Sequence, residues 1–175
     1  MDTLLERPCR KAFLDLSLDG TYLGQIIIRV MDEGYKALNF LHMCSGDMGP
    51  SYANSKISGV TFKGKDREFV VMGENSVEGG TSSKAVLSGV HWLKEFEREI
   101  YVGAPMKAGQ VLGVFLDDLA SVFRIITRDD PSCTRRIGSC FGTVVEGLDV
   151  LKDVIDSNQD ITKVKVTDCG LVFSL

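Results

Sequence analysis

Near its C-terminus the chain reads Ser139-Cys-Phe-Gly-Thr-Val-Val-Glu-Gly-Leu-Asp-Val-Leu-Lys-Asp-Val-Ile155, and Val164-Lys-Val-Thr-Asp-Cys-Gly-Leu171 follows shortly after. The first stretch predicts a strand that leads into a helix after Gly147, because apolar residues recur at helical spacing from Leu148 to Ile155. The second stretch alternates apolar and polar residues, as a half-buried strand does. The chain is therefore expected to end in strand, helix and strand, with the helix at about Leu148 to Asp156.

The other end of the chain predicts a hairpin and a helix. Lys11 to Leu18 alternates in character, Asp19-Gly20 fits a two-residue hairpin turn, and Tyr22 to Val30 supplies the returning strand. Glu33 to Cys44 carries apolar residues at helical spacing, and Ser45-Gly46 supplies the glycine that commonly ends a helix.

Between these ends, short apolar bursts alternate with glycine-rich or charged turns. Asn75 to Gly89, rich in small polar residues, predicts a surface loop. Many short strands with few helices favour a closed antiparallel barrel or a sandwich. The strands predicted from residue 52 onward are Ile57 to Phe62, Glu68 to Met72, Glu99 to Val102, Val111 to Phe115, Val122 to Thr127, Ser139 to Val145, Val164 to Val166 and Leu171 to Phe173.

The composition of the chain argues against several classes of function. The 175 residues fit one domain, and a net charge of −4 argues against a protein that reads a nucleic-acid backbone. No apolar run approaches the roughly 20 residues that cross a bilayer, and residues 1–10 lack the apolar core of a signal peptide. We therefore expect no membrane partner and an intracellular protein, cytoplasmic or nuclear. The five cysteines lack a CxxC pair, and no cluster has metal-ligand spacing, so we expect neither a metal nor a cofactor.

The order and spacing of several short pieces across the chain resemble the cyclophilin family. The resemblance runs from about Lys11 to Leu171 and implies an eight-stranded antiparallel β-barrel capped at each end by a helix. It divides the chain into an N-terminal extension, residues 1–10, and a cyclophilin-like domain, residues 11–175. The pieces are Phe13-Leu-Asp-Leu, Asp19-Gly20, Leu23-Gly24, Asn39-Phe40, Phe69 with Gly73, Phe123 to Thr127, Phe141-Gly142, Glu146-Gly147 and Asp168-Cys-Gly.

Cyclophilins isomerise Xaa-Pro bonds with an arginine that lies in a Phe-His-Arg-Ile-Ile-Pro segment. A guanidinium there can hydrogen-bond the twisted amide of the transition state. The planar ground state does not gain this stabilisation. The matching segment of this chain is Ile57-Ser-Gly-Val-Thr-Phe62, so Ser58 takes the histidine position and Gly59 the arginine position. The resemblance therefore implies that these two catalytic positions are degenerate and that no catalytic residue remains.

The resemblance also implies a remodelled groove. Glu68 to Asn75 keeps the pocket phenylalanine as Phe69 but replaces a glutamine with Met72. In Ser121-Val-Phe-Arg124, which stands where the family has Ser-Gln-Phe-Phe, Val122 and Arg124 replace a second glutamine and an apolar wall. Phe69, Met72, Val122 and Arg124 are the predicted peptide-binding residues. The family's inhibitor-contacting tryptophan and its downstream pocket histidine align near Cys133 and Gly138.

Other surfaces compete with this groove. His91-Trp92 places the sole tryptophan in a position to anchor a partner or to close over the barrel. The insertion Lys63 to Arg67 lies beside the old site, and Arg67 and Arg124 are the two candidates for a substitute guanidinium. For Arg67 the simpler expectation is a solvated loop charge.

These features favour a catalytically inactive cyclophilin-like domain, a pseudo-enzyme scaffold that binds a protein or peptide segment. The alternative is a divergent peptidyl-prolyl isomerase with weak activity that comes from pocket shape and desolvation. A third reading is that the barrel docks within a longer polypeptide or assembly.

Overall fold

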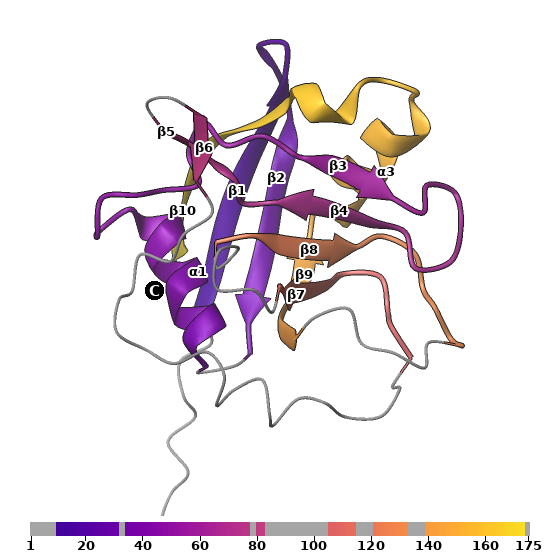
Figure 1. Cartoon of the computed structure of the whole chain (residues 1–175), viewed down its shortest axis with the longest axis horizontal. Helices are drawn as coiled ribbons and strands as arrows, with labels where there is room; N and C mark the ends of the chain where they lie inside the picture. Colours follow the sequence, from indigo (N-terminus) through magenta and orange to yellow (C-terminus); the bar gives the residue numbers. More distant parts are fainter. Residues whose placement is uncertain are drawn as a thin grey trace, which may run out of the picture.

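The fold is built from one eight-stranded antiparallel sheet with the strand order β10-β1-β2-β9-β7-β8-β4-β3 (Figure 1). The computed structural model describes residues 10–31, 34–77, 80–82, 105–114, 121–132 and 139–173. The strands of this sheet are β1 (Arg10–Leu18), β2 (Thr21–Val30), β3 (Gly59–Thr61), β4 (Phe69–Met72), β7 (Gln110–Gly113), β8 (Phe123–Ile126), β9 (Ser139–Glu146) and β10 (Val164–Val172).

The two outer strands of the sheet are brought together by the segment just before β3. Ile57 donates its backbone N–H to the carbonyl of Val164 at 3.0 Å, and Val166 donates to the carbonyl of Ser55 at 2.8 Å. These bonds join the segment just before β3 to β10 and close the sheet into the expected barrel, since paired edges leave no open strand there.

The first hairpin forms as the sequence predicts. Asp19 and Gly20 connect β1 to β2 with φ values of 48° and 80°. Two successive left-handed residues are what a tight hairpin turn needs, and aspartate followed by glycine tolerates that conformation well.

Within the described residues two α-helices accompany the sheet, α1 (Tyr35–Ser45) and α3 (Leu148–Asp156), with a short 3-10 turn, η2 (Ile161–Lys163), between α3 and β10. Gly46 ends α1 with φ 69° and donates its N–H to the carbonyl of His42 at 2.8 Å. Gly147 precedes α3 with φ 85°, and a Cβ there would lie 2.0 Å from the carbonyl oxygen of Gln25. A glycine is therefore required where β9 turns into α3.

The main core lies between α1 and the inner face of the sheet. Phe40 of α1 packs edge-on against Phe123 at 5.2 Å between ring centroids, and it also contacts Tyr52 at 5.6 Å and Phe141 at 5.2 Å. These rings are almost fully buried. Aromatic burial on this scale dominates the packing of a small core.

The predictions from the sequence are wrong at two places, and others fall on residues that the structure does not describe. The two strands predicted at 164–166 and 171–173 are one continuous strand, β10, because a register shift opposite Asp15 and Leu16 absorbs the irregular middle. Residues 75–77 and 80–82 pair as the short strands β5 (Asn75–Val77) and β6 (Gly80–Ser82), where a loop was expected. Residues 1–9 and 83–104 lie outside the described residues, as does Glu33 at the expected start of α1.

None of the helices in the described segments is long and apolar enough to cross a membrane.

Candidate functional site

The candidate site is a row of residues that crosses four neighbouring strands. Val71 of β4 lies opposite Gly59 of β3 on one side and opposite Arg124 of β8 on the other, and Arg124 in turn lies opposite Leu112 of β7. Directly opposed residues of antiparallel strands project to the same face of the sheet. Phe69, two residues before Val71, shares that face, which is turned away from the main core.

Arg124 lies over the ring of Phe69, with its Cζ atom 5.2 Å from the ring centroid. A guanidinium at this distance from an aromatic face makes a favourable cation–π contact. Burial lowers the pKa of the half-buried Arg124 from its ordinary value, yet an arginine stays charged at neutral pH. The stack therefore presents a positive charge fixed on an apolar floor.

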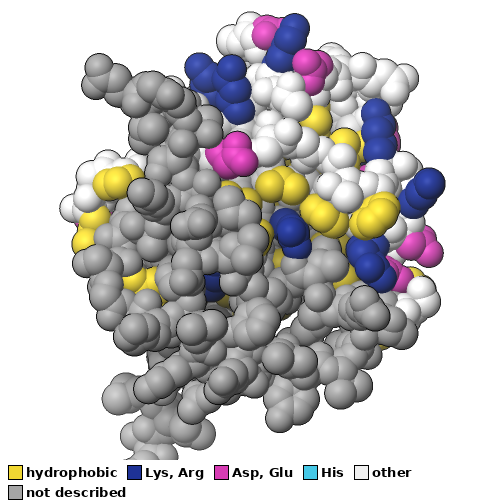
Figure 2. Space-filling model, viewed as in Figure 1, with side chains coloured by type: hydrophobic (Ala, Val, Ile, Leu, Met, Phe, Trp, Pro, Cys, Tyr) yellow, Lys and Arg dark blue, Asp and Glu magenta, His cyan; other side chains and the backbone are white. Residues whose placement is uncertain are grey.

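Phe62 extends this floor toward solvent. Its ring meets Phe69 edge-on at 6.3 Å, and its side chain is 51% exposed whereas Phe69 is 6% exposed. Figure 2 shows hydrophobic side chains in a row across this face, over β3 and β4, with lysine and arginine side chains beside them. Phe62 and Arg124 are thus the parts of the site that a ligand can touch, and Phe69 lies beneath them. We call the set Phe62, Phe69, Val71 and Arg124 the outer groove.

Phe62 is a residue that the sequence did not single out. Its φ is 55°, a left-handed value that costs a bulky side chain about 1–3 kcal/mol. Strain of this kind persists where surrounding structure holds it, and it gathers at binding sites. The one available signal in the sequence was Lys63-Gly64 directly after Phe62. This pair indicates a turn at the end of the strand.

Three of the four predicted groove residues are buried, and two of them lie outside the outer groove. Met72 is 1% exposed and belongs to the main core with Val70 and Phe123. It lies three positions from Phe69 in one strand, so the two side chains point to opposite faces. Val122 is 4% exposed. The structure therefore brings Phe69 and Arg124 together and places Met72 and Val122 in the interior.

The two degenerate positions lie at the open side of the groove. Ser58 is exposed and donates its backbone N–H to the carbonyl of Val71 at 2.8 Å. Gly59 is partly exposed, and a Cβ added there would meet no heavy atom within 4 Å. Position 59 thus has room for a side chain, but its glycine supplies no side-chain hydrogen-bond donor.

A buried hydrogen-bond chain holds the register of β4 and β8. Tyr52 donates its hydroxyl to the carbonyl of Ser121 at 2.7 Å, and the hydroxyl of Ser121 donates to the carbonyl of Gly73 at 2.8 Å. Gly73 has φ 99°, and a Cβ there would lie 2.3 Å from the carbonyl oxygen of Ser121. The close approach that glycine allows keeps Val71 opposite Arg124.

The insertion at 63–67 is fastened to the barrel, and Arg67 is not the solvated charge that the sequence favoured. Its Nε donates to the buried carboxylate of Asp130 at 2.7 Å. That hydrogen bond is the main cause that lowers the pKa of Asp130, with Ser132 contributing. Arg67 is thereby committed to a structural ion pair.

Glu68, 2% exposed, completes the attachment of the insertion. Its carboxylate accepts the N–H of Gly64 at 2.6 Å and the hydroxyl of Thr127 at 2.7 Å, and it lies 3.5 Å from Nε of Arg128. A buried carboxylate with several donors is well satisfied. The network ties the turn after Phe62 to the end of β8.

Four further positions were candidates from the sequence. His91, Trp92, Cys133 and Gly138 are outside the described residues. Within the described segments no group of three or more His, Cys, Asp or Glu residues could hold a metal ion.

Known proteins resemble this chain both in sequence family and in fold. The family model described as cyclophilin type peptidyl-prolyl cis-trans isomerase/CLD matches residues 10–171. The crystal structure of the Mimivirus cyclophilin is similar, with a TM-score of 0.67 and 19% sequence identity, covering 99% of this chain and 97% of that chain. At 19% identity the structural similarity supports the fold alone. The match to the family model covers nearly the whole chain.

Proposed function

Because the chain belongs to the cyclophilin-type peptidyl-prolyl cis-trans isomerase family, we propose that it is a peptide-binding member with little or no isomerase activity. The observation that carries the proposal is the stack of Arg124 on Phe69 in the same row as Gly59. At the position where the family resemblance expects the catalytic arginine, the chain has no side chain.

The chemistry of the outer groove suggests its ligand. Phe62 offers an exposed apolar ring, and Arg124 offers a planar guanidinium that can bind a carboxylate through two parallel hydrogen bonds. A peptide segment with an apolar residue beside an aspartate or glutamate fits both features. The proposed recognition requires no proline.

Reduced catalysis follows from what a transition-state donor contributes. Removing one such donor costs an acyl-transfer enzyme about 2.7–4 kcal/mol in barrier height. Met72 and Val122, which the resemblance aligns with glutamines, are buried and cannot donate a hydrogen bond. Binding is the function that survives these changes.

A second candidate is a divergent isomerase in which Arg124 supplies the guanidinium. Family membership supports it, and so does the position of Arg124 one strand away from Gly59 on the same face. The half-buried stack on Phe69 would hold such a group in place. Catalysis by the wild-type protein that disappears in Arg124→Met would favour this candidate.

The cellular setting is part of the proposal. We propose an intracellular site of action, cytoplasmic or nuclear, in which the partner is a protein segment and the barrel can be one domain of a larger assembly. Cys44, Cys140 and Cys169, the cysteines within the described segments, carry free thiols. Free thiols are typical of a reducing compartment.

The binding claim is tested with two short peptides that differ only in aspartate or asparagine beside a leucine. The wild-type protein should prefer the aspartate peptide, and Arg124→Glu should lose at least about 1.5 kcal/mol of that binding. Arg29→Glu is the matched control, because Arg29 is an exposed arginine on β2, away from the groove. Equal affinity of the wild type and Arg124→Glu would move the binding site elsewhere, for example to the segment that contains Trp92.

A further inference from the structure

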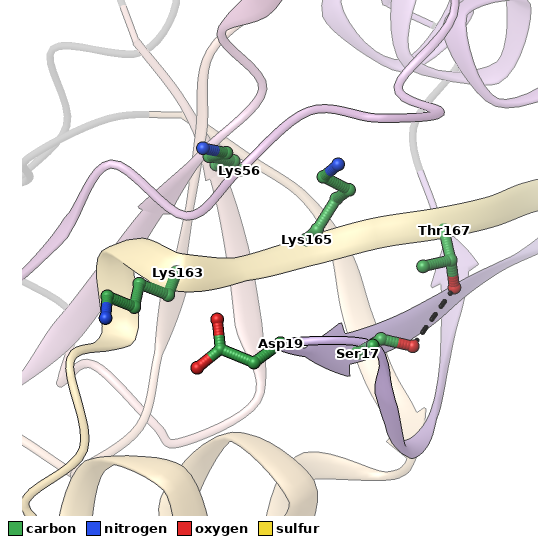
Figure 3. Close-up of a pocket in the computed structure, with 7 residues that line it drawn as sticks. Ser17, Asp19, Lys56, Lys163, Lys165 and Thr167 are labelled. Carbon is green, nitrogen blue, oxygen red and sulfur yellow. Dashed lines mark hydrogen bonds between the residues drawn. The ribbon is translucent and has the colours of Figure 1, made fainter.

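A hollow lies at the seam where the barrel closes. It has a volume of about 490 Å³ and is lined by Ser17, Asp19, Gly20, Lys56, Lys163, Lys165 and Thr167. Figure 3 shows Lys163 and Lys165 on one continuous segment and Lys56 on a neighbouring one, with Ser17 and Thr167 on the opposite side from Lys163. None of these residues belongs to the outer groove.

The lysines are held close together by the backbone. Lys165 of β10 pairs directly with Lys56 across the bridge that closes the barrel, and on its other side it pairs with Ser17 of β1. Directly opposed residues share a face, and like charges in that arrangement destabilise the sheet. Lys163 stands two residues before Lys165 and adds a third ammonium group.

This positive charge is only partly neutralised by the protein. Among the described residues, no carboxylate lies within salt-bridge distance of Lys56, Lys163 or Lys165, although three other ion pairs form elsewhere. Asp19 is the one acidic residue that lines the hollow. Asp160, three residues before Lys163, attracts that lysine electrostatically, but its carboxylate is hydrogen-bonded to the N–H and hydroxyl of Thr162 at 3.0 and 2.6 Å. The hollow therefore keeps an excess of two positive charges in a chain whose net charge is −4.

Hydroxyl groups complete the lining. Ser17 and Thr167 approach at 3.5 Å between their oxygens, and Thr167 also donates to the backbone carbonyl of Asp15 at 3.3 Å. Ammonium groups bind oxyanions as point charges, and hydroxyls add short directional bonds. Because Thr167 donates its proton to the carbonyl of Asp15, Ser17 is the hydroxyl that can turn its proton toward a ligand. Three cations with this donor match a compact dianion with several oxygens better than they match a single carboxylate.

We propose that this hollow, the seam pocket, binds a phosphate group. The group would lie between Lys56, Lys163 and Lys165, and it would relieve the repulsion between the two directly paired lysines. The inference does not depend on the proposed function of the outer groove.

The test is a titration of the isotopically labelled full chain with inorganic phosphate and, in a second arm, with phosphoserine, followed by NMR at constant ionic strength. Phosphate should shift the amides around the seam pocket and saturate in the millimolar range, whereas acetate should not. Similar affinities in the two arms would assign recognition to the phosphate group alone. Tighter binding of phosphoserine would assign it to a phosphorylated side chain.

Variants decide whether the pocket is responsible. Lys56→Gln and Lys165→Gln should each weaken phosphate binding by at least about tenfold, since each removes a charge-assisted contact. Lys152→Gln on the exposed face of α3 is the matched control and should leave it unchanged. Asp19→Asn should strengthen binding, because it removes the opposing carboxylate and asparagine tolerates the left-handed turn position. Absence of saturable shifts at the pocket, or equal effects of Lys152→Gln and Lys165→Gln, would overturn the proposal.

Discussion

Exchanging the arginine between positions 124 and 59 is the perturbation that depends most directly on the geometry of the outer groove. A side chain at position 59 has room, because a Cβ on Gly59 meets no heavy atom within 4 Å. Gly59 and Arg124 flank Val71 in one row. At about 4.8 Å per strand their Cα atoms are about 10 Å apart, so two arginine side chains on this face reach the same space.

The size of the expected effect on the rate follows from the electrostatic repulsion between the two guanidinium groups. Guanidinium groups about 6 Å apart repel by about 3 kcal/mol at an effective dielectric constant of about 20, and by under 1 kcal/mol in bulk water. Arg124 is half-buried, so the cost lies between these limits. A new guanidinium in Gly59→Arg would be pushed away from the substrate, and that variant alone should gain little activity. The double variant Gly59→Arg with Arg124→Phe should be faster than the single variant by about 3- to 100-fold.

The assay is cis–trans exchange of a short Ala-Pro peptide, followed by NMR at high protein concentration. Gly59→Lys is a control for charge without the planar donor pair, and Arg29→Phe is a control for a surface arginine lost elsewhere. Even the double variant should stay below an ordinary cyclophilin, because Met72 and Val122 do not supply the expected polar contacts. Equal rates for Gly59→Arg and the double variant would refute the reasoning about repulsion, and so would a wild-type activity that Arg124→Phe abolishes.

Two further predictions concern the attachment of the insertion. Glu68→Ala should lower the free energy of unfolding by about 2–3 kcal/mol, because it removes a buried charged acceptor from the Gly64 amide and the Thr127 hydroxyl; chemical denaturation measures this, with Lys152→Ala as an exposed control, and a loss under about 0.5 kcal/mol would contradict it. The Arg67–Asp130 pair lowers the folded pKa of Asp130 below its ordinary value of 3.8, so it stabilises fully above that pH and loses its effect as the pH falls below it. The stability difference between wild type and Arg67→Met should therefore shrink on acidification below about pH 4, and a constant difference would exclude the pair as its source.

Features with a local cause could be predicted from the sequence. The Asp19-Gly20 turn and the glycine after α1 are set by residues adjacent in the chain, and both are found as expected. The antiparallel barrel could be inferred because many short strands, two helices and the order of family-like pieces agree with one architecture.

The site was less predictable because it depends on which strands become neighbours. The pairing of Arg124 with Val71, and hence its stack on Phe69, requires the register between β4 and β8, which a buried chain through Ser121 and Gly73 maintains. The position of Met72 could have been found from alternation within β4, since it lies three residues from Phe69. Alignment to a family glutamine obscured that simple count. The ion pair of Arg67 joins residues distant in sequence, which no local pattern indicates, and Phe62 had only the turn signal Lys63-Gly64 beside it.

The central claim is that the outer groove binds a peptide without isomerising it. Exchange spectroscopy on the wild-type protein with one labelled peptide, which carries leucine and aspartate next to an Xaa-Pro bond, measures both properties together. The account predicts shifts at Phe62, Phe69, Val71 and Arg124, while the cis–trans exchange of the bound peptide stays at the uncatalysed rate. Exchange accelerated to the level of an ordinary cyclophilin, or shifts that leave these four residues untouched, would contradict it.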